Sequence, residues 1–329
     1  MDIPTITIPG FVWACQFFPE TASSRRLEPS CTLADLNVED GFIWLHLGLS
    51  DARVPGLLEA LGLPEAARTA LISRDPHTVL SVESDLVCGT IVDFQRDFDE
   101  MTNEIGWLHF AVMDRLIVTT RLHPLRSVDR ARITIEKAKK INGPLDILET
   151  LVIEFQRTAI ALVLEMNDEL NTIEDTVYAA TTRDERRRLA PVRRTIVQLH
   201  RHLRTILALL RRESAGDEQD MPEAFPDMAE RLMDRLETVE RDVHSLQERA
   251  RLLHEDIDSK ISSETNRHLY ILSLMTAFLL PPTLVTGFFG MNTANLPFAQ
   301  EAHGTLFAFL MIVMSVGLAW LLVKRTGIL

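Results

Sequence analysis

Two long uncharged stretches near the C-terminal end are the most pronounced feature of the hydrophobic pattern. The first, 269–289, has 21 residues without a charge, and the second, 305–323, has 19. A helix needs roughly 20 apolar residues to cross a bilayer core of about 30 Å. The pattern therefore predicts two transmembrane helices over these ranges, connected by an outer loop at 290–304 and followed by a short tail at 324–329.

A period of about 3.5 residues extends from Pro124 to the first uncharged stretch, because apolar residues recur at alternating steps of three and four. This spacing predicts a long-helix bundle and stalk over 126–268, with one continuous helix from about Asp227 through Leu280. That helix is either a mechanical connection to the bilayer or an ordinary member of a three-helix bundle, and periodicity does not separate the two. The three seams are Leu148, Leu151, Phe155, Ala159, Leu162, Met166, Leu170, Ile173 and Val177, then Leu189, Val192, Ile196, Leu199, Leu203, Ile206 and Leu210, then Leu232, Leu236, Val239, Val243, Leu246, Ala250, Leu253, Ile257 and Ile261.

The first part of the chain, 1–125, has short β-rich runs instead of a helical period. We expect an α/β cytoplasmic domain here, in which the last four strands form an antiparallel meander because they follow one another closely. The expected strands are 11–18, 41–47, 78–83, 86–94, 106–113 and 116–121, and the expected helices are 54–61 and 64–73.

Charge is distributed unevenly along the chain. The 34 basic and 47 acidic residues give a net charge of -13, yet the mean hydropathy is slightly positive, at +0.06. The two uncharged stretches account for this combination, since only Glu301, Lys324 and Arg325 lie after His268. The acidic balance argues against a nucleic-acid partner, which requires a basic footprint.

The basic residues that flank the spans predict the orientation. Arg267 precedes the first span, Lys324 and Arg325 follow the second, and the outer loop has no Lys or Arg. By the positive-inside rule we expect a multi-pass membrane protein with both termini in the cytoplasm. The three cysteines are far apart and include no C-x-x-C pair, as expected of reduced thiols.

Small and weakly polar residues form a stripe along the first span. Such a stripe either mediates helix packing or lines water. A two-helix hairpin cannot enclose an aqueous path, so conduction requires several copies around an axis. Helix dipoles would place partial negative charge at the outer mouth, where the Asn292 amide oxygen can face a hydrated cation. The stripe comprises Asn266, Ser273, Thr276, Thr283, Gly287 and Gly290.

Gly290-Met291-Asn292, placed between a proline-containing span and a second span that ends in Lys324-Arg325, resembles the signature of the CorA family of divalent-metal transporters. The runs 266–270, 280–281, 286–290 and 290–293 with 296–297 resemble the ZntB-like zinc transporter branch. The resemblance implies an α/β/α cytoplasmic domain, a stalk helix and a homopentameric funnel in the bacterial inner membrane. It also implies that Zn2+ is the transported ion and that no cofactor is required.

The resemblance assigns roles to the matching residues. Gly290, Met291 and Asn292 would form the outer selectivity mouth. Three features depart from the branch: Ala294-Asn295 stands in place of a common Gly-Gly, the proline is doubled, and the basic tail is short. The residues that would line the pore are Asn266, Leu269, Ser273, Thr276, Leu280, Thr283 and Gly287.

Other titratable residues give weaker candidate sites. His254 and Asp258 are spaced i, i+4, as a regulatory metal pair would be, although a solvated helix face has the same spacing. Neither span has an Asp, Glu, His, Lys or Arg residue, the groups that usually relay protons, so any proton-linked group must lie at an end, where Glu301, His303 and His268 are the candidates. The acidic segment around Asp217, Glu218 and Asp220 is either a solvated loop or a cation sensor.

Enzyme motifs are absent from the sequence: it has no P-loop, G-x-S-x-G, H-E-x-x-H or G-x-G-x-x-G run. We therefore expect a protein without enzymatic activity. The main hypothesis is a zinc transporter with an axial homopentameric pore, with or without coupling to protons. The alternatives are a CorA-type magnesium or cobalt channel with the same architecture and, from another class, a membrane-anchored scaffold or metal sensor that conducts nothing.

Overall fold

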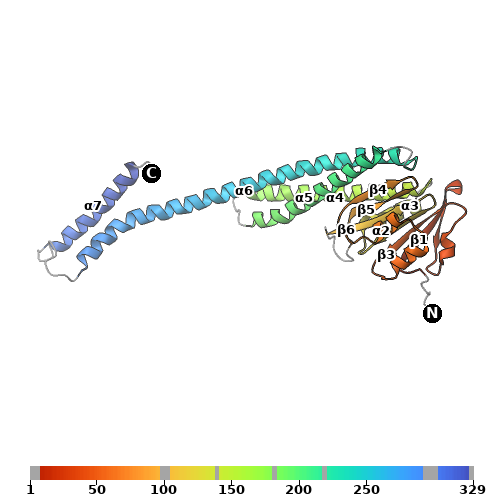
Figure 1. The fold of residues 1–329 in the computed structure, drawn as a ribbon. Coiled ribbons are helices and arrows are strands. Elements are labelled where there is room, and N and C mark those ends of the chain that lie inside the picture. Colours follow the sequence, from red (N-terminus) through yellow and green to blue (C-terminus); the bar gives the residue numbers. More distant parts are fainter. Residues whose placement is uncertain are drawn as a thin grey trace. The chain divides into compact units, whose positions relative to one another are not determined.

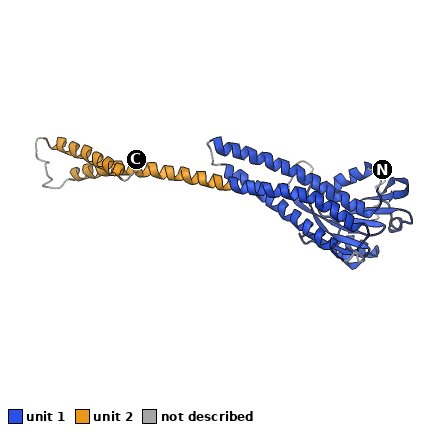
Figure 2. Ribbon diagram, turned by 90° about the horizontal axis from the view of Figure 1, so that it is seen from above, with its two compact units in different colours: residues 1–253 blue, residues 254–329 orange. Residues whose placement is uncertain are grey.

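The computed structural model describes residues 8–96, 104–137, 141–179, 184–216, 221–291 and 303–325. The chain has two compact units, 1–253 and 254–329 (Figure 2). Helix α6 (Phe225–Phe289) contributes to both units. The predicted domain boundaries at 125/126 and 268/269 remain predictions.

The first unit contains a seven-stranded sheet with the order β2-β1-β3-β7-β6-β5-β4 (Figure 1). Strands β4 to β7 pair antiparallel with their neighbours in the chain, so the predicted meander is confirmed. Each of the six predicted strands agrees with an observed one to within one residue. The strands are β1 (Phe11–Phe18), β2 (Ser23–Leu27), β3 (Phe42–Gly48), β4 (Val79–Glu83), β5 (Leu86–Phe94), β6 (Ile105–Val112) and β7 (Leu116–Arg121).

Two features of the sheet were missed by the sequence analysis. Strand β2 reads Ser-Ser-Arg-Arg-Leu and exposes its first four residues, so it lacks the apolar alternation that marks a half-buried strand. Such a charged edge strand also discourages pairing with another chain. The second feature is the parallel pairing of β3 with β7, which joins Ile43 to Leu116 across a long stretch of sequence.

Helices cover both faces of the sheet. Helices α1 (Val54–Ala60) and α2 (Glu65–Ile72) pack on one face, where Leu58 and Leu71 join Leu45 and Val118 in a buried core. Helices α3 (Arg126–Lys137) and α4 (Pro144–Ala179) contact strands of the same sheet. On α4 the ring of Phe155 stacks on that of Phe94 at 6.0 Å. The expected α/β/α arrangement is therefore confirmed.

The long helices follow the predicted apolar seams. They are α4, α5 (Glu185–Ser214) and α6, and the second unit adds α7 (Gly304–Arg325). Every predicted seam residue of α4 and α5 is buried, and the α6 seam is buried through Ile257. Helix α6 extends beyond the predicted range, because Pro281 and Pro282 lie inside it and do not end it.

The end of α5 protects one edge of the sheet. The Val82 N–H of edge strand β4 donates to Glu213 Oε2 at 3.3 Å. The Arg212 guanidinium donates to the Leu80 carbonyl, also at 3.3 Å. These two side chains provide hydrogen bonds to β4 that a further strand would otherwise supply.

A buried carboxylate connects the sheet to α3, which the sequence analysis did not predict. Asp93, only 1% exposed at the end of β5, accepts hydrogen bonds from the Ser127 N–H at 3.0 Å and the Ser127 hydroxyl at 2.6 Å. The Phe94 N–H donates to it as well, at 2.7 Å. Burial raises the pKa of Asp93 to about 6, although these hydrogen bonds act in the opposite direction.

This raised pKa predicts a pH-dependent stability. In the unfolded chain the Asp93 pKa lies near 3.9, so the folded chain holds this proton more tightly, and its contribution to stability falls as pH rises from about 4 to about 6. In Asp93→Asn, which cannot ionise, this part of the pH dependence is absent. Thermal melts of the purified protein between pH 4 and 7 should show wild type losing about 3 kcal/mol relative to the variant. Parallel curves for the two proteins would contradict the assignment.

Candidate functional site

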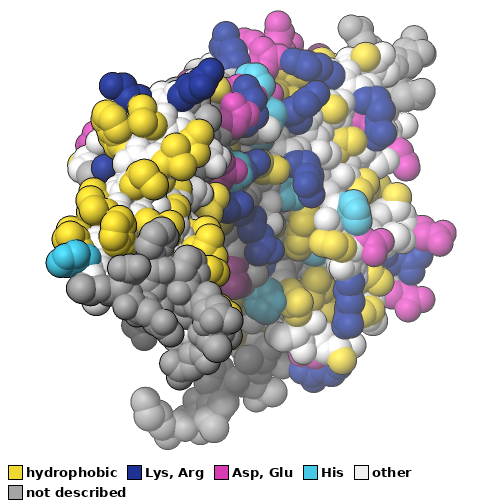
Figure 3. Space-filling model, turned by 90° about the vertical axis from the view of Figure 1, so that its left-hand side faces the viewer, with side chains coloured by type: hydrophobic (Ala, Val, Ile, Leu, Met, Phe, Trp, Pro, Cys, Tyr) yellow, Lys and Arg dark blue, Asp and Glu magenta, His cyan; other side chains and the backbone are white. Residues whose placement is uncertain are grey.

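Two helices of the described chain are long and apolar enough to cross a membrane, judged by length and composition: α6 and α7. Figures 1 and 2 show α7 running back beside the last part of α6. Figure 3 shows hydrophobic side chains gathered over these two helices, with few charged side chains among them. An exposed surface of this kind is stable when lipid, and not water, surrounds it.

Helix α7 ends in a basic pair that follows an aromatic residue. Lys324 Nζ lies 5.0 Å from the centre of the Trp320 ring, a distance suited to a cation–π interaction. Tryptophan and lysine both favour the boundary between lipid and water. The pair therefore marks the point where α7 reaches the membrane surface.

The predicted pore-lining residues lie on one exposed face of α6. Asn266, Leu269, Ser273, Thr276, Leu280, Thr283 and Gly287 are all exposed. They follow one another at alternating steps of three and four, so they form a single line along the helix. An open groove runs along this face, and it is lined by Leu272, Met275, Thr276, Leu279, Leu280, Thr283, Leu284 and Gly287.

The opposite face of the same span is partly buried. Leu274, Phe278, Pro281 and Val285 are less exposed than their neighbours. They also recur at steps of three and four, so they form a second line along the helix. Phe278 and Val285 each lie two residues after a member of the exposed line, Thr276 and Thr283. Helix α7 buries one small residue, Ala319. The exposed line, hereafter the pore stripe, is thus distinct from the packed face of α6.

Threonine hydroxyls give the pore stripe its polar character. Thr276 Oγ1 donates to the Leu272 carbonyl at 2.9 Å, and Thr283 Oγ1 donates to the Leu279 carbonyl at 2.7 Å. A hydroxyl that donates its only hydrogen to a backbone carbonyl can still accept hydrogen bonds through its lone pairs. The two side chains therefore offer oxygen acceptors to whatever fills the groove. Water and the hydration shell of a cation supply the matching donors.

Two glycines shape the C-terminal end of α6. No atom lies within 4 Å of a Cβ built at Gly287, so this level of the stripe is open. A Cβ at Gly290 would lie 3.0 Å from the Thr286 carbonyl, which is tighter than ordinary contact. The Gly290 N–H donates to that carbonyl at 2.9 Å, and Met291, next to it, is half exposed. Glycine at 290 therefore lets the chain leave the helix without displacing its last turn.

Several predicted site residues lie outside the described residues: Asn292, Glu301, Asp217, Glu218 and Asp220. His268 on α6 and His303 before α7 are exposed. The predicted mouth is thus described only through Gly290 and Met291.

The predicted regulatory pair is present as a contact. His254 Nε2 lies 3.5 Å from Asp258 Oδ2, one turn further along α6. Within the described ranges, no group of three or more His, Cys, Asp or Glu side chains is arranged to hold a metal ion. The pair thus supplies two ligands of the four that a closed structural zinc site uses.

A histidine contact between α5 and α6 was missed by the sequence analysis. His200 Nε2 lies 2.9 Å from Glu240 Oε1, and the His200 and His244 rings are 5.3 Å apart. His202 instead packs edge-on against Trp107 at 5.5 Å, so the two histidines of α5 contact different elements. The i, i+4 spacing of Glu240 and His244 in the sequence could have indicated that these two side chains lie on one face of α6. Their contact with His200 of α5 could not be predicted, because it depends on how the two helices pack.

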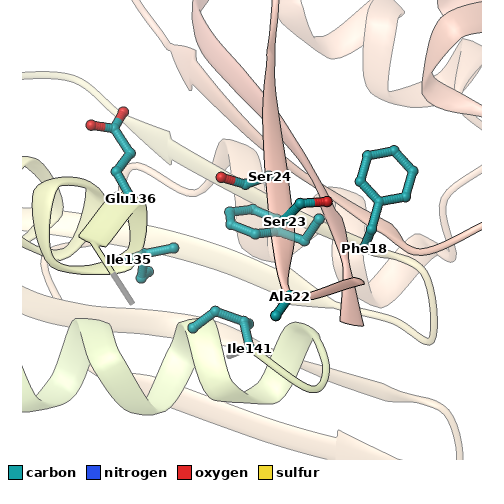
Figure 4. Close-up of a pocket in the computed structure, with 8 residues that line it drawn as sticks. Phe18, Ala22, Ser23, Ser24, Ile135, Glu136 and Ile141 are labelled. Atoms are coloured by element: carbon teal, nitrogen blue, oxygen red, sulfur yellow. The ribbon is translucent and has the colours of Figure 1, made fainter. Parts of the chain in front are cut away.

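A cavity between the sheet edge and α3 is a separate feature. Figure 4 shows Phe18 and Ser23 on one side of it and Ile135 and Glu136 on the other. Glu136 is the one ionisable residue among those that line it. A single carboxylate with serine hydroxyls is a weak donor set for a divalent cation.

Comparison with known proteins gives concordant matches. The profile of the family described as "CorA-like Mg2+ transporter protein" matches residues 39–325. The chain is 24% identical over 293 residues to the zinc transport protein ZntB of Pectobacterium atrosepticum, with 86% of each chain covered. It is 26% identical over 295 residues to the divalent cation transporter CmaX of Pseudomonas aeruginosa, again with 86% of each covered.

A solved structure shares the fold. The structure of the full-length CmaX protein superimposes with a TM-score of 0.78 at 22% identity, covering 96% of this chain and 98% of that one. The agreement includes the α/β domain, the long helices and the two C-terminal apolar helices. Since the family profile covers most of the chain, the protein belongs to the CorA-like family of membrane transporters, which carry divalent cations and are not enzymes.

Proposed function

We propose that this protein transports zinc across the bacterial inner membrane through an axial path formed by five copies. The single observation that supports this most directly is the pore stripe, an exposed line on α6 of hydroxyl, amide and glycine positions with two leucines, on the face opposite the packed side. Small and weakly polar residues in a span either mediate helix packing or line water. In five copies around an axis, this line would face the water-filled path. Gly290, Met291 and Asn292 form the outer mouth in this proposal.

The stripe is suited to an ion that keeps its water. It is neutral throughout, and its oxygen atoms accept hydrogen bonds. Neutral hydroxyl and amide oxygens do not readily replace the first hydration shell of a small divalent ion. The ion therefore passes as a hydrated complex, which the hydroxyls of Thr276 and Thr283 contact through the water molecules.

Zinc is the favoured ion because the first relative is named a zinc transport protein and because the runs that flank the mouth resemble that branch. A second candidate, transport of magnesium or cobalt, is favoured by the donor set. The pore stripe offers oxygen and no imidazole or thiolate, and oxygen is the ligand that magnesium prefers. The histidines nearest to the spans in the sequence, His268 and His303, lie just beyond the ends of the spans.

Orientation and coupling follow from the flanking charges. Arg267 and the pair Lys324-Arg325 support cytoplasmic termini. Because residues 269–289 and 305–323 include no Asp, Glu, His, Lys or Arg, proton coupling depends on His268, Glu301 or His303. The pair His254 and Asp258, and the acidic loop with Asp217, Glu218 and Asp220, are proposed as regulatory cation contacts.

Ion-resolved flux into proteoliposomes tests this function. We expect uptake of Zn2+ that exceeds uptake of Mg2+ and Co2+ under competition, and that rises when the exterior is made more acidic than the interior. Preferred uptake of Mg2+ would support the second candidate. Flux equal to that of empty vesicles would contradict transport altogether, and flux insensitive to the pH gradient would remove proton coupling.

The outer mouth gives one mutational prediction. Asn292→Ala removes the proposed ring of amide oxygens, so we expect divalent uptake to fall about tenfold, the equivalent of losing roughly 1.4 kcal/mol of water-mediated contact. Asn295→Ala, three residues further along the same loop, is the matched control and should leave uptake within about twofold of wild type. Equal uptake by the Asn292 variant and the control would exclude the mouth assignment.

The Thr283 hydroxyl of the pore stripe gives a second mutational prediction. Thr283→Val keeps the side-chain shape and removes the acceptor, so we expect uptake to fall about fivefold, which corresponds to about 1 kcal/mol for one lost hydrogen bond. Thr286→Val is the control, because Thr286 also donates to a backbone carbonyl but lies off the stripe. If both variants lose uptake to the same extent, the loss reflects helix stability and not the path.

A further inference from the structure

Helices α4 and α5 carry opposite charge. Helix α4 has eight acidic residues and one arginine, whereas α5 has nine arginines and two acidic residues. In a chain with a net charge of -13, an arginine-rich helix is unexpected. Figure 1 shows the two helices alongside each other in the first unit, so one subunit presents both charges.

Three arginines on the outer face of α5 have no ion-pair partner among the residues that the structure describes. Arg187, Arg194 and Arg201 follow at steps of seven, so they form one line, and all three are exposed. They make no ion pair with another described residue. Other arginines of α5 do pair: Arg188 with Glu169 of α4 at 2.9 Å, and Arg211 with Glu237 of α6. The outer line, hereafter the arginine stripe, is separate from the buried seam on the other side of α5.

The outer face of α4 mixes acidic and apolar residues. Asp168 and Asp175 also lie seven residues apart, are exposed and form no ion pair with a described residue. Glu165 is exposed on the same face. Two large apolar residues lie beside them, Leu164 and Tyr178, which are 62% and 74% exposed. We call this the acidic stripe, and its apolar members gain free energy when another surface covers them.

The two stripes cannot meet in one subunit. Each lies opposite the buried seam of its own helix, and both seams face the same bundle. The outer faces of α4 and α5 therefore point away from each other's helix. Their repeat is nevertheless the same, because seven residues of helix advance about 10 Å in both. The arginines on α5 and the carboxylates on α4 therefore have matching spacing, but they can face each other only when they belong to two different subunits.

We propose that the arginine stripe of one subunit docks on the acidic stripe of the next. Two different surfaces in contact make a head-to-tail interface, and repetition of such an interface closes a ring when the rotation permits. A ring is what an axial path requires, so the inference rests on the proposed function for its biological meaning. Guanidinium groups are suited to the contact, because they bind carboxylates with two hydrogen bonds and tolerate partial burial.

The ring contact can be tested by cross-linking. Neither α4 nor α5 has a lysine, so wild type offers no amine at the stripe. Arg194→Lys and Arg201→Lys keep the charge and introduce amines that a carbodiimide joins to a carboxylate in contact. In the purified full-length protein we expect cross-linked dimers and larger ladders on a denaturing gel, with the new lysines joined to Asp168, Asp175 or Glu165 in peptide mass spectra.

Controls separate the contact from chance collision. Adding Asp168→Asn and Asp175→Asn to the lysine variant should reduce the ladder about tenfold, and so should high salt, which screens exposed ion pairs. Lysines at Arg25 and Arg26 on the exposed edge strand β2 should give no ladder. Absence of the ladder, or links that map to other carboxylates, would overturn the proposal.

Charge exchange provides a second, independent test. Reversal of Arg187, Arg194 and Arg201 to Glu should raise the dissociation constant of the oligomer about tenfold in a dilution series. The reversed acidic stripe, with Glu165, Asp168 and Asp175 changed to Arg, should do the same, and the two sets combined should restore association. Failure of the combined variant to recover, when its thermal melt is unchanged, contradicts the contact. Oligomeric state is read without ion flux, so loss of transport in an intact oligomer tells against the proposed function alone.

Discussion

One-sided burial along α6 is the constraint on which the soluble bundle depends. The seam positions 236, 243, 250 and 257 are buried, and they pack with the seams of α4 and α5 in the same bundle. In the apolar part of α6, positions 278 and 285 are partly buried, whereas Thr276 and Thr283 of the pore stripe are exposed. Each part of the helix therefore has one packed face and one exposed face. No glycine interrupts α6 before Gly287, and the two prolines lie within the helix.

Charge and polarity are divided along the chain in a way that serves cation movement. The spans hold no Asp, Glu, His, Lys or Arg, and Thr276 and Thr283 of the first span donate to backbone carbonyls. An unsatisfied hydroxyl in hydrocarbon is costly, whereas a hydroxyl bonded to its own helix is tolerated and still accepts from water. The net negative charge lies in the part of the chain before the first span. In the orientation that we propose, this is the sign expected where a cation leaves an inward path. The arginines of α5 are the exception, and in our proposal the next subunit neutralises them.

Local patterns predicted most of the elements. The seams of α4 and α5 are complete in the sequence, and each predicted seam residue of these helices is buried, because one-sided burial imposes a helical period. The meander strands were found within one residue for the same reason, with a period of two. Strand β2 was missed, and helix α3, which lies within the predicted helical region 126–268, was not predicted as a separate helix. The first is a charged edge strand, and the second begins where a carboxylate from β5, Asp93, accepts its N-terminal hydrogen bonds. The edge position of β2 and the contact of Asp93 with the start of α3 both depend on residues far apart in the sequence, so neither can be seen in a local pattern.

By itself, the sequence determined two spans, their flanking charges, the stripe of small and polar residues and the family resemblance, since hydrophobicity and spacing are properties of neighbouring residues. Tertiary structure decided which face of α6 stays exposed, that β3 pairs parallel with β7, and that His200 contacts Glu240 on another helix. These features depend on contacts between residues far apart in the chain, whose geometry is set by packing and not by local preference. The separation of the arginine stripe from the acidic stripe belongs to the same class, because helix packing decides which arginines find a partner within the subunit and which remain on its surface.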